Sequence, residues 1–385
     1  MTRRRDAEAL AEAEANSLEE TLADRHVVVC TGSGGVGKTT TAAAIAMAAA
    51  DRGRRTIVLT IDPARRLAQS LGLSSLDNTP RPVEGVEGLD AMMLDMKRTF
   101  DEVIERHADD PRHARKITSN RFYQQLSSTL AGTQEYMAME KLYDLHTTGT
   151  YDCIVIDTPP TRNALDFLDA PKRLTDFLEG RFLKMFLAPG MAAGRVAGRA
   201  VGYGTGLFMR AASRITGVGV LGDLAEFFQS FEGMYAGFKA RAQAVYKQLQ
   251  SAESAFVVVT TAEDHALREA RYFLQRLAQD GMPTAGLVVN RVTEPAVESV
   301  GRHQLHEAAA KLEGDSREPE QQAVAALLRL AAGDLAVSER EQRSLLAAMH
   351  GLDPRVLVRI PQRADDIHDL DGLRWMGARL AGVGD

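Results

Sequence analysis

Residues 27–40 read VVVCTGSGGVGKTT and join an apolar, β-branched run to a glycine-rich loop and an alanine-rich stretch. The run predicts a buried strand, and the stretch from Lys38 to Arg52, which has no helix-breaking residue, predicts a helix. Gly32 to Thr39 matches G-x-x-x-x-G-K-[ST] in full, between a strand and a helix as this motif requires. The unit constrains the chain to an α/β fold with the loop at the carboxyl end of a strand.

Five further short apolar runs recur along the chain, with helical stretches between them. They are 56–61 (TIVLTI), 151–157 (YDCIVID), 255–260 (AFVVVT), 285–290 (AGLVVN) and 355–360 (RVLVRI). Strands that are buried on both faces and joined by helices form mostly parallel sheets. The pattern therefore predicts a doubly wound P-loop NTPase core of the α/β class, with at least six parallel strands and a ligand site at their carboxyl ends.

Two segments without convincing strands predict a helical insertion subdomain, at about residues 97–148 and about 170–250. Residues 1–26 are expected to form an N-terminal helical arm, either a solvated helix or a loosely held segment, and residues 27–385 a single ATPase domain. Within the second insertion, no acidic residue occurs between Glu179 and Asp223, and glycines recur every four residues from 190 to 202. The basic residues of this stretch are Arg181, Lys184, Arg195, Arg199, Arg210 and Arg214.

Composition narrows the possible partners. The net charge is −6 and the pI about 5.9, so no overall positive field is available to hold nucleic acid, and no nucleic-acid partner is expected. Cys30 and Cys153, the two cysteines, lie in apolar runs and predict buried thiols, not a disulfide or a zinc site. The N-terminus lacks the apolar region of a secretory signal, and no apolar run reaches about 18 residues. We expect a cytoplasmic protein, with peripheral contact to a membrane left open.

The loop predicts binding of ATP and Mg²⁺. Its glycines let backbone N–H groups converge on phosphate oxygens, assisted by the positive end of the helix dipole. Lys38 is expected to reach the β- and γ-phosphates, and Thr39 to offer its hydroxyl to Mg²⁺. The other loop residues assigned to the nucleotide are Gly34, Gly35, Val36, Gly37 and Thr40.

Two aspartates follow predicted strands. Asp62, in IDPARR, is suited to orient a water molecule against the γ-phosphate, and also to cap a following helix. Asp157, in YDCIVIDTPP, ends a buried strand as a Mg²⁺-associated carboxylate does, with water between the carboxylate and the ion.

GSGGVGKTT, LTIDPARRLAQSLGL and YDCIVIDTPPTRNALDFL resemble the P-loop, switch I and switch II of the arsenite-pump and tail-anchored-protein-targeting ATPase family. The likeness continues in GTQEYMAMEKLYDL, VVVTTAEDHALREARYFLQRL, GLVVNRV and VRIPQRADDIHDLDGL, and covers residues from about 27 to 380. It implies a dimer that closes on ATP and moves a helical subdomain to bind a protein or membrane client. It also implies that Asp62 is the water-activating aspartate, that Asn290 reads adenine and that Pro361 lies in the loop beside it.

Position 33 departs from the family, whose loop reads G-K-G-G-x-G-K-[ST]. The first lysine of that loop reaches the partner's phosphates, and a cation acting in trans contributes on the order of 10³ to 10⁵ in rate. Serine supplies no such charge. Three explanations compete: slow hydrolysis, a substitute cation such as Arg65 or Arg162, or a heterodimer in which a paralogous ATPase contributes the lysine. We favour the third over a homodimer.

Other features separate the possible functions. With two cysteines inside predicted strands, neither the zinc site nor the arsenite site of the family is expected. The basic, glycine-rich insertion suits a client helix, a lipid surface or simple packing on the sheet. An ATP-driven switch is the leading hypothesis. A weakly hydrolysing scaffold subunit of a heteromeric complex is the alternative, and the acidic pI disfavours a partition-type ATPase.

Overall fold

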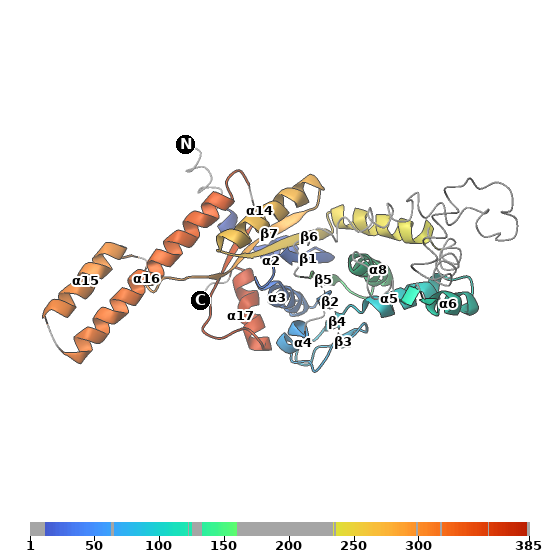
Figure 1. Ribbon diagram of the computed structural model, residues 1–385, viewed down its shortest axis with the longest axis horizontal. Coiled ribbons are helices and arrows are strands. Elements are labelled where there is room, and N and C mark those ends of the chain that lie inside the picture. Colours follow the sequence, from blue (N-terminus) through green and yellow to red (C-terminus); the bar gives the residue numbers. More distant parts are fainter. Residues whose placement is uncertain are drawn as a thin grey trace, which may run out of the picture.

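The computed structural model describes residues 12–62, 65–121, 123–124, 133–159, 234, 236–297, 299–315, 318–352 and 354–382. Across these residues an eight-stranded sheet has the order β3-β4-β2-β5-β1-β6-β7-β8 (Figure 1). Its strands are β1 (Val27–Gly32), β2 (Thr56–Thr60), β3 (Arg81–Pro82), β4 (Leu89–Met93), β5 (Cys153–Asp157), β6 (Ser254–Thr261), β7 (Thr284–Val292) and β8 (Leu357–Pro361). All neighbours pair in parallel except β3 and β4. The predicted mostly parallel α/β fold is confirmed.

Helices cover both faces of the sheet, as the doubly wound pattern requires. Alternate residues of β1 face opposite layers: Val27 and Val29 belong to one apolar core, and Val28 and Cys30 to the other. One layer contains α2 (Leu18–Leu22), α3 (Lys38–Ala50), α4 (Arg66–Ser70) and α17 (Leu370–Leu380). The other contains α5 (Met96–His107), α6 (Pro111–Thr118), α8 (Thr133–Thr148), α14 (Asp264–Gln279) and helical residues 236–250.

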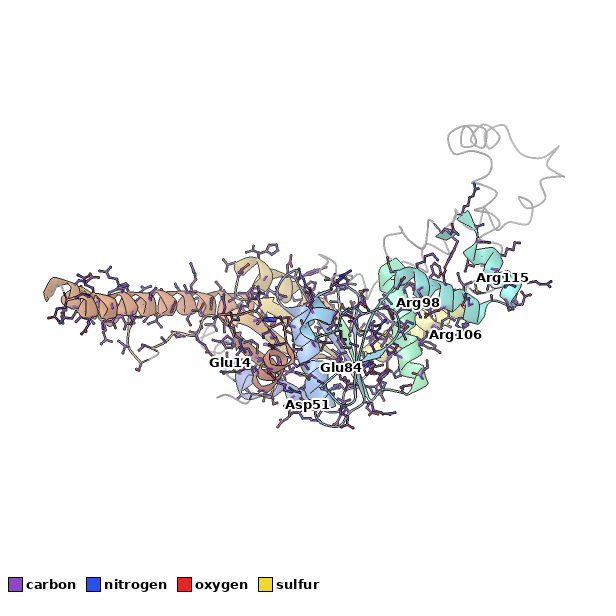
Figure 2. All side chains as sticks on the ribbon, turned by 90° about the horizontal axis from the view of Figure 1, so that it is seen from below. Glu14, Asp51, Glu84, Arg98, Arg106 and Arg115 are labelled. Carbon is purple, nitrogen blue, oxygen red and sulfur yellow. The ribbon has the colours of Figure 1, made fainter. Side chains whose placement is uncertain are left out.

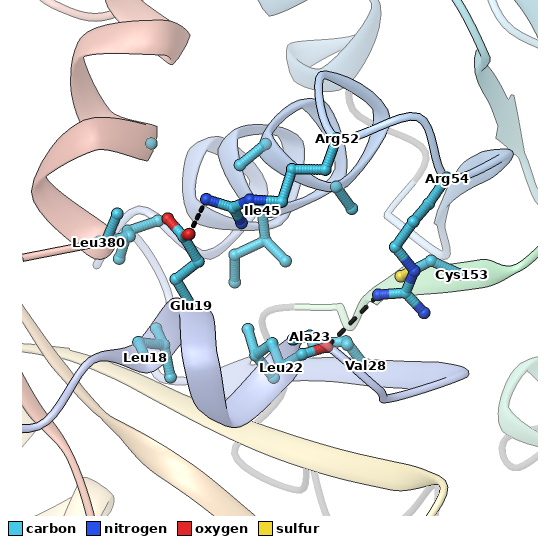
Figure 3. A pocket seen from close by; sticks show the side chains of 14 residues that line it. Leu18, Glu19, Leu22, Ala23, Val28, Ile45, Arg52, Arg54, Cys153 and Leu380 are labelled. Carbon is cyan, nitrogen blue, oxygen red and sulfur yellow. Dashed lines mark hydrogen bonds and ion pairs between the residues drawn. The ribbon is translucent and has the colours of Figure 1, made fainter.

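The N-terminal helix is packed, which differs from the expected solvated helix. Leu18 and Leu22 of α2 are 1% and 8% exposed, because they belong to the apolar cluster that also contains residues of α3 and α17. A small apolar cavity of about 80 Å³, lined by residues of α2, α3 and α17, lies beside them (Figure 3). Glu19 forms an ion pair with Arg52 at its edge, and Arg54 donates to the Leu22 carbonyl. This cavity lies by the first residue of β5, Cys153, at the end of the sheet opposite the carboxyl ends.

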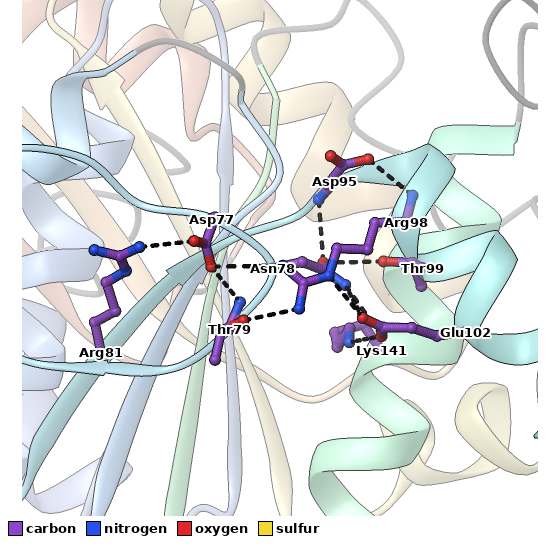
Figure 4. A network of polar contacts seen from close by, with 9 residues as sticks. All are labelled: Asp77, Asn78, Thr79, Arg81, Asp95, Arg98, Thr99, Glu102 and Lys141. Carbon is purple, nitrogen blue, oxygen red and sulfur yellow. Dashed lines mark hydrogen bonds and ion pairs between the residues drawn. The ribbon is translucent and has the colours of Figure 1, made fainter.

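A buried asparagine fixes the helical layer next to β4. The side-chain oxygen of Asn78 accepts from the Asp95 N–H at 3.1 Å and from the Thr99 hydroxyl at 3.0 Å. Its side-chain nitrogen donates to the Glu102 carboxylate (Figure 4). Lys141 of α8 donates to the same carboxylate at 2.8 Å. Since a buried amide needs these partners, the network ties α5 and α8 to the loop between α4 and β3.

A buried ion pair holds helical residues 236–250 against α8. Arg241 donates to Glu140 at 2.7 Å, and Glu140 is 2% exposed. Tyr136 donates to the same carboxylate. Burial raises the pKa of Glu140 in spite of the arginine. The part of the predicted second insertion up to residue 233, including its basic and glycine-rich stretch, lies outside the described residues.

A long helical hairpin extends from the sheet. Helix α15 (Arg302–Asp315) packs along α16 (Pro319–Ala348), and both lead away from the core (Figures 1 and 2). The base of α16 is anchored by Glu341, whose carboxylate accepts from the N–H and hydroxyl of Thr293 after β7. Val324, Leu327 and Leu330 are exposed. In the described part of the chain, no helix has the length and apolar character needed to cross a bilayer.

Candidate nucleotide-binding and catalytic site

The P-loop connects β1 to α3 and needs glycine at two of its positions. Gly32 has φ +152°, and a Cβ there would lie 2.0 Å from the Val259 carbonyl oxygen. Gly37 has φ +99°, and a Cβ there would lie 2.2 Å from the Asn290 amide nitrogen. Glycine alone allows the chain to lie this close to β6 at position 32 and to the Asn290 side chain of β7 at position 37.

The lysine of the P-loop motif is buried. Lys38 is 6% exposed, and its ammonium donates to the Ser33 carbonyl oxygen at 2.7 Å. Burial lowers its pKa, opposed by the nearby carboxylates of Asp157 and Asp62. The cation is therefore held inside the loop at the place where phosphate oxygens would be received.

Asp157 is fully buried at the end of β5, beside β1 and β2 in the sheet. Its Oδ2 accepts from the Thr39 hydroxyl at 2.8 Å and from the Thr60 hydroxyl at 2.9 Å. Its Oδ1 is buried and has no hydrogen-bond partner. Burial raises the pKa of Asp157 to about 6, although both threonines and Lys38 favour the charged form. A buried acceptor without a partner calls for a ligand, and a hydrated cation satisfies it.

A cleft of about 700 Å³ opens beside the P-loop at the carboxyl ends of the strands. Of the residues predicted from the sequence, those that line it are Gly35, Gly37, Lys38, Thr39, Thr40, Asp62, Asn290 and Pro361. Asp157 does not line the cleft itself, but its carboxylate accepts a hydrogen bond from Thr39, which does. The Val36 side chain is buried in the core beneath the loop, and Gly34 lines a separate cavity.

Asp62 follows β2 and lines the cleft next to Lys38. Its backbone N–H donates to the Thr60 hydroxyl at 3.2 Å, which fixes the start of the turn. Helix α4 has Arg65, not Asp62, as its N-cap, so the capping interpretation of this aspartate is wrong. Arg65 itself is exposed at the start of α4. Arg162 lies outside the described residues.

Asn290 contacts the P-loop directly. Its amide donates to the Val36 carbonyl at 2.9 Å, and its side-chain oxygen accepts from the Arg291 N–H at 3.0 Å. Arg291 has φ +59°, an uncommon conformation for a residue other than glycine, and donates to the Gly35 carbonyl. The sequence predicted Pro361 in the loop after the last strand, whereas the structure makes it the last residue of β8.

Sequence reasoning missed four residues of this site. Arg66, Arg291 and Arg363 line the cleft and supply positive charge toward a polyanion. Thr60 holds Asp157. A signal existed for Arg66 and Arg291, which follow the switch aspartate and the predicted adenine-side asparagine in sequence. No sequence signal marked Thr60, which lies in an apolar strand. Its role depends on the register that pairs it with Asp157.

Ser33 lies on the far side of the loop from the cleft. It is 8% exposed, and its hydroxyl donates to the Glu269 carboxylate of α14. A second cavity of about 350 Å³ opens there, lined by residues 33–36 of the loop, by residues at the start of α14 and by Arg291. Position 33 is thus turned toward its own subunit.

The P-loop at the carboxyl end of β1, the threonine-bonded aspartate at the end of β5 and the cleft between them define the site of a P-loop NTPase. Comparison with known proteins identifies the family. The family model described as anion-transporting ATPase matches residues 25–313, so the chain belongs to this family.

Three relatives are named as ATPases. ATPase get3 of Schizosaccharomyces pombe is 26% identical over 262 residues, covering 68% of this chain and 71% of the relative. ATPase asna-1 of Caenorhabditis elegans is 25% identical, with 73% and 78% covered. ATPase ARSA2 of Chlamydomonas reinhardtii is 28% identical, with 73% and 71% covered. The predicted resemblance to the arsenite-pump and targeting ATPases is confirmed at the level of the family.

Proposed function

We propose that this chain is an ATP-driven conformational switch. It binds ATP with Mg²⁺ in the cleft beside the P-loop, hydrolyses it as part of a dimer, and moves the helical insertion predicted over about 170–250 to bind a protein or membrane client. The observation that carries the proposal is the unpaired Oδ1 of Asp157 next to the Thr39 hydroxyl. The family and the names of the relatives support ATP hydrolysis, and the dimer and client follow from the resemblance of the switch motifs.

The residues present fit Mg²⁺. Thr39 Oγ1 would bind the ion and Asp157 Oδ1 would bind it through water, and hydroxyl and carboxylate oxygens are ligands that Mg²⁺ prefers. When bound, the ion neutralises charge on the phosphates. The Thr60 hydroxyl holds the other oxygen of Asp157 and so keeps the carboxylate fixed.

The protein side chains have separable roles in this proposal. Lys38 exchanges the Ser33 carbonyl for phosphate oxygens, a stronger partner for a buried ammonium than a neutral carbonyl. Asp62, which lines the cleft, orients the attacking water as a general base would. Arg66 and Arg291 add positive charge along the path of the triphosphate.

Ser33 makes the dimer partner part of the proposal. Its hydroxyl carries no charge and contacts Glu269 of the same chain, so it offers no cation to a second subunit. We infer that a paralogous ATPase with lysine at this position completes the catalytic site in trans. The pair would then be asymmetric, since this chain receives a lysine and gives none.

ATP turnover tests the proposal. The purified chain alone should bind ATP and hydrolyse it slowly, and addition of the lysine-bearing paralogue from the same cells should raise the rate by on the order of 10³. The Asp62→Asn variant should still bind ATP and accumulate the nucleotide-bound complex. Turnover by the single chain at the full rate of the pair would refute the need for a partner.

A scaffold subunit that binds ATP and hardly hydrolyses it is the second candidate. The contact of Ser33 with its own subunit favours it, because this contact removes position 33 from trans catalysis. The two functions differ in cells: a switch loses function with Asp62→Asn, whereas a scaffold keeps it.

A further inference from the structure

The Ser33 peptide unit is held from two sides. Its hydroxyl donates to Oε2 of Glu269, and its carbonyl oxygen accepts from the Lys38 ammonium at 2.7 Å. Glu269 lies in α14 behind the loop, where the exposed His265 side chain, one turn earlier, places Nε2 3.4 Å from the other carboxylate oxygen. The contact joins residues that are 236 positions apart in the sequence.

The loop needs such an anchor. Four of its first six residues are glycines at positions 32, 34, 35 and 37, and glycine loses more conformational freedom on ordering than any other residue. A nucleotide that binds a disordered loop must compensate for this entropy, which lowers its affinity. The hydroxyl-to-carboxylate bond involves a charged acceptor and belongs to the stronger class of hydrogen bonds.

We propose that Glu269 is a positioning residue for the P-loop. Through the Ser33 hydroxyl it fixes the backbone of the glycine-rich loop at this position, and so keeps the loop ready for the triphosphate before any nucleotide arrives. Serine at position 33 has acquired a role within its own subunit in place of the trans role of lysine. This inference rests on the proposed nucleotide site. It assigns to Glu269, a residue outside that site, a contribution to the affinity for nucleotide.

The test is a nucleotide titration of single and double variants. The chain has one tryptophan, Trp375, and the Arg363 guanidinium, which lines the cleft, lies 4.7 Å from its ring centre, so tryptophan fluorescence reports on the cleft. The probe is a non-hydrolysable ATP analogue with Mg²⁺, with calorimetry as a second readout. We expect Glu269→Ala to weaken binding about tenfold, the effect of losing a hydrogen bond to a charged group.

Two variants separate positioning from general damage. Glu269→Gln keeps a side-chain oxygen that can accept from Ser33 and should restore most of the affinity. Ser33→Ala should weaken binding as much as Glu269→Ala does, and the double variant no further, because both remove the same bond. In turnover with the partner present, KM should rise while kcat changes little.

Glu263→Ala is the matched control. Glu263 lines the same cavity at the start of the same helix, and its side chain does not cap the helix. This variant should bind like the wild type. Lys38→Ala, which should abolish binding, separates the two proposals: if it binds normally, the nucleotide site itself is wrong. Wild-type affinity in Glu269→Ala, additive losses in the double variant, or no rescue by glutamine would overturn the positioning role.

Discussion

The buried carboxylate of Asp157 lowers the free energy of unfolding when it is charged, and this effect can be measured without nucleotide. The pKa of Asp157 is raised from 3.8 to about 6, chiefly by burial. The folded protein therefore holds this proton more tightly than the unfolded chain does. The resulting stabilisation is fully present below about pH 3.8 and is lost as the pH rises through about 6. At about 1.4 kcal/mol per pH unit, the charged carboxylate costs the nucleotide-free protein about 3 kcal/mol at neutral pH.

The Asp157→Asn variant removes this titration and keeps an oxygen that can accept from Thr39 and Thr60. The free energy of unfolding is measured with urea in EDTA, for variant and wild type, between pH 4 and pH 7.5. Any fixed cost of the buried amide nitrogen is the same at each pH. The difference between variant and wild type should therefore grow in favour of the variant by about 2 kcal/mol from pH 4 to pH 7.5, because a part of the effect is already present at pH 4.

Asp152→Asn provides the control. The Asp152 side chain is 44% exposed, and hydrogen bonds from Arg55 lower its pKa to about 2. Its stabilising contribution is complete above about pH 4, so the difference between this variant and the wild type should be flat from pH 4.5 to pH 7.5. A flat profile for Asp157→Asn as well would refute the assignment of Asp157 as a carboxylate whose pKa is raised by burial.

Three further variants test the packing and the cleft. Asn78→Ala should lower the free energy of unfolding by about 2 kcal/mol in urea titrations, since it leaves the buried Thr99 hydroxyl and the Asp95 N–H without their acceptor, while Thr79→Ala nearby should change it little. Arg241→Met should cost about 3 kcal/mol in the same assay, because the Glu140 carboxylate would be left buried without its cation; an unchanged stability would contradict the ion pair. Asn290→Ala should weaken binding of the ATP analogue and reduce its preference over the GTP analogue in fluorescence titrations; an unchanged preference would exclude adenine recognition by this side chain.

Strands with strong local signals were predictable. The six apolar runs found in the sequence correspond to β1, β2, β5, β6, β7 and β8, because continuous β-branched runs between helices have few other uses. β4 was missed, since LDAMM contains an aspartate and no β-branched residue. β3 has two exposed residues and no sequence pattern of its own.

The residues of the site were likewise predictable only where a local sequence pattern marks them. The residues of the P-loop carry their chemistry in one contiguous motif, so the placement of Lys38 and Thr39 at the cleft could be predicted. The Thr60 bond to Asp157 depends on strand register, and the Ser33 bond to Glu269 joins distant segments. No local pattern encodes such contacts. In the sequence, Ser33 stands out because it replaces the lysine of the family motif. The structure adds that its hydroxyl contacts Glu269.

Steady-state ATP turnover of the purified chain and of its Ser33→Lys variant tests the need for a trans cation most directly. Saturating ATP removes the expected loss of affinity caused by breaking the contact with Glu269. The wild type should be slow at every protein concentration. The variant should be faster by on the order of 10³, with a rate per chain that rises as dimers form. Equal turnover by the two proteins would contradict the role assigned to position 33.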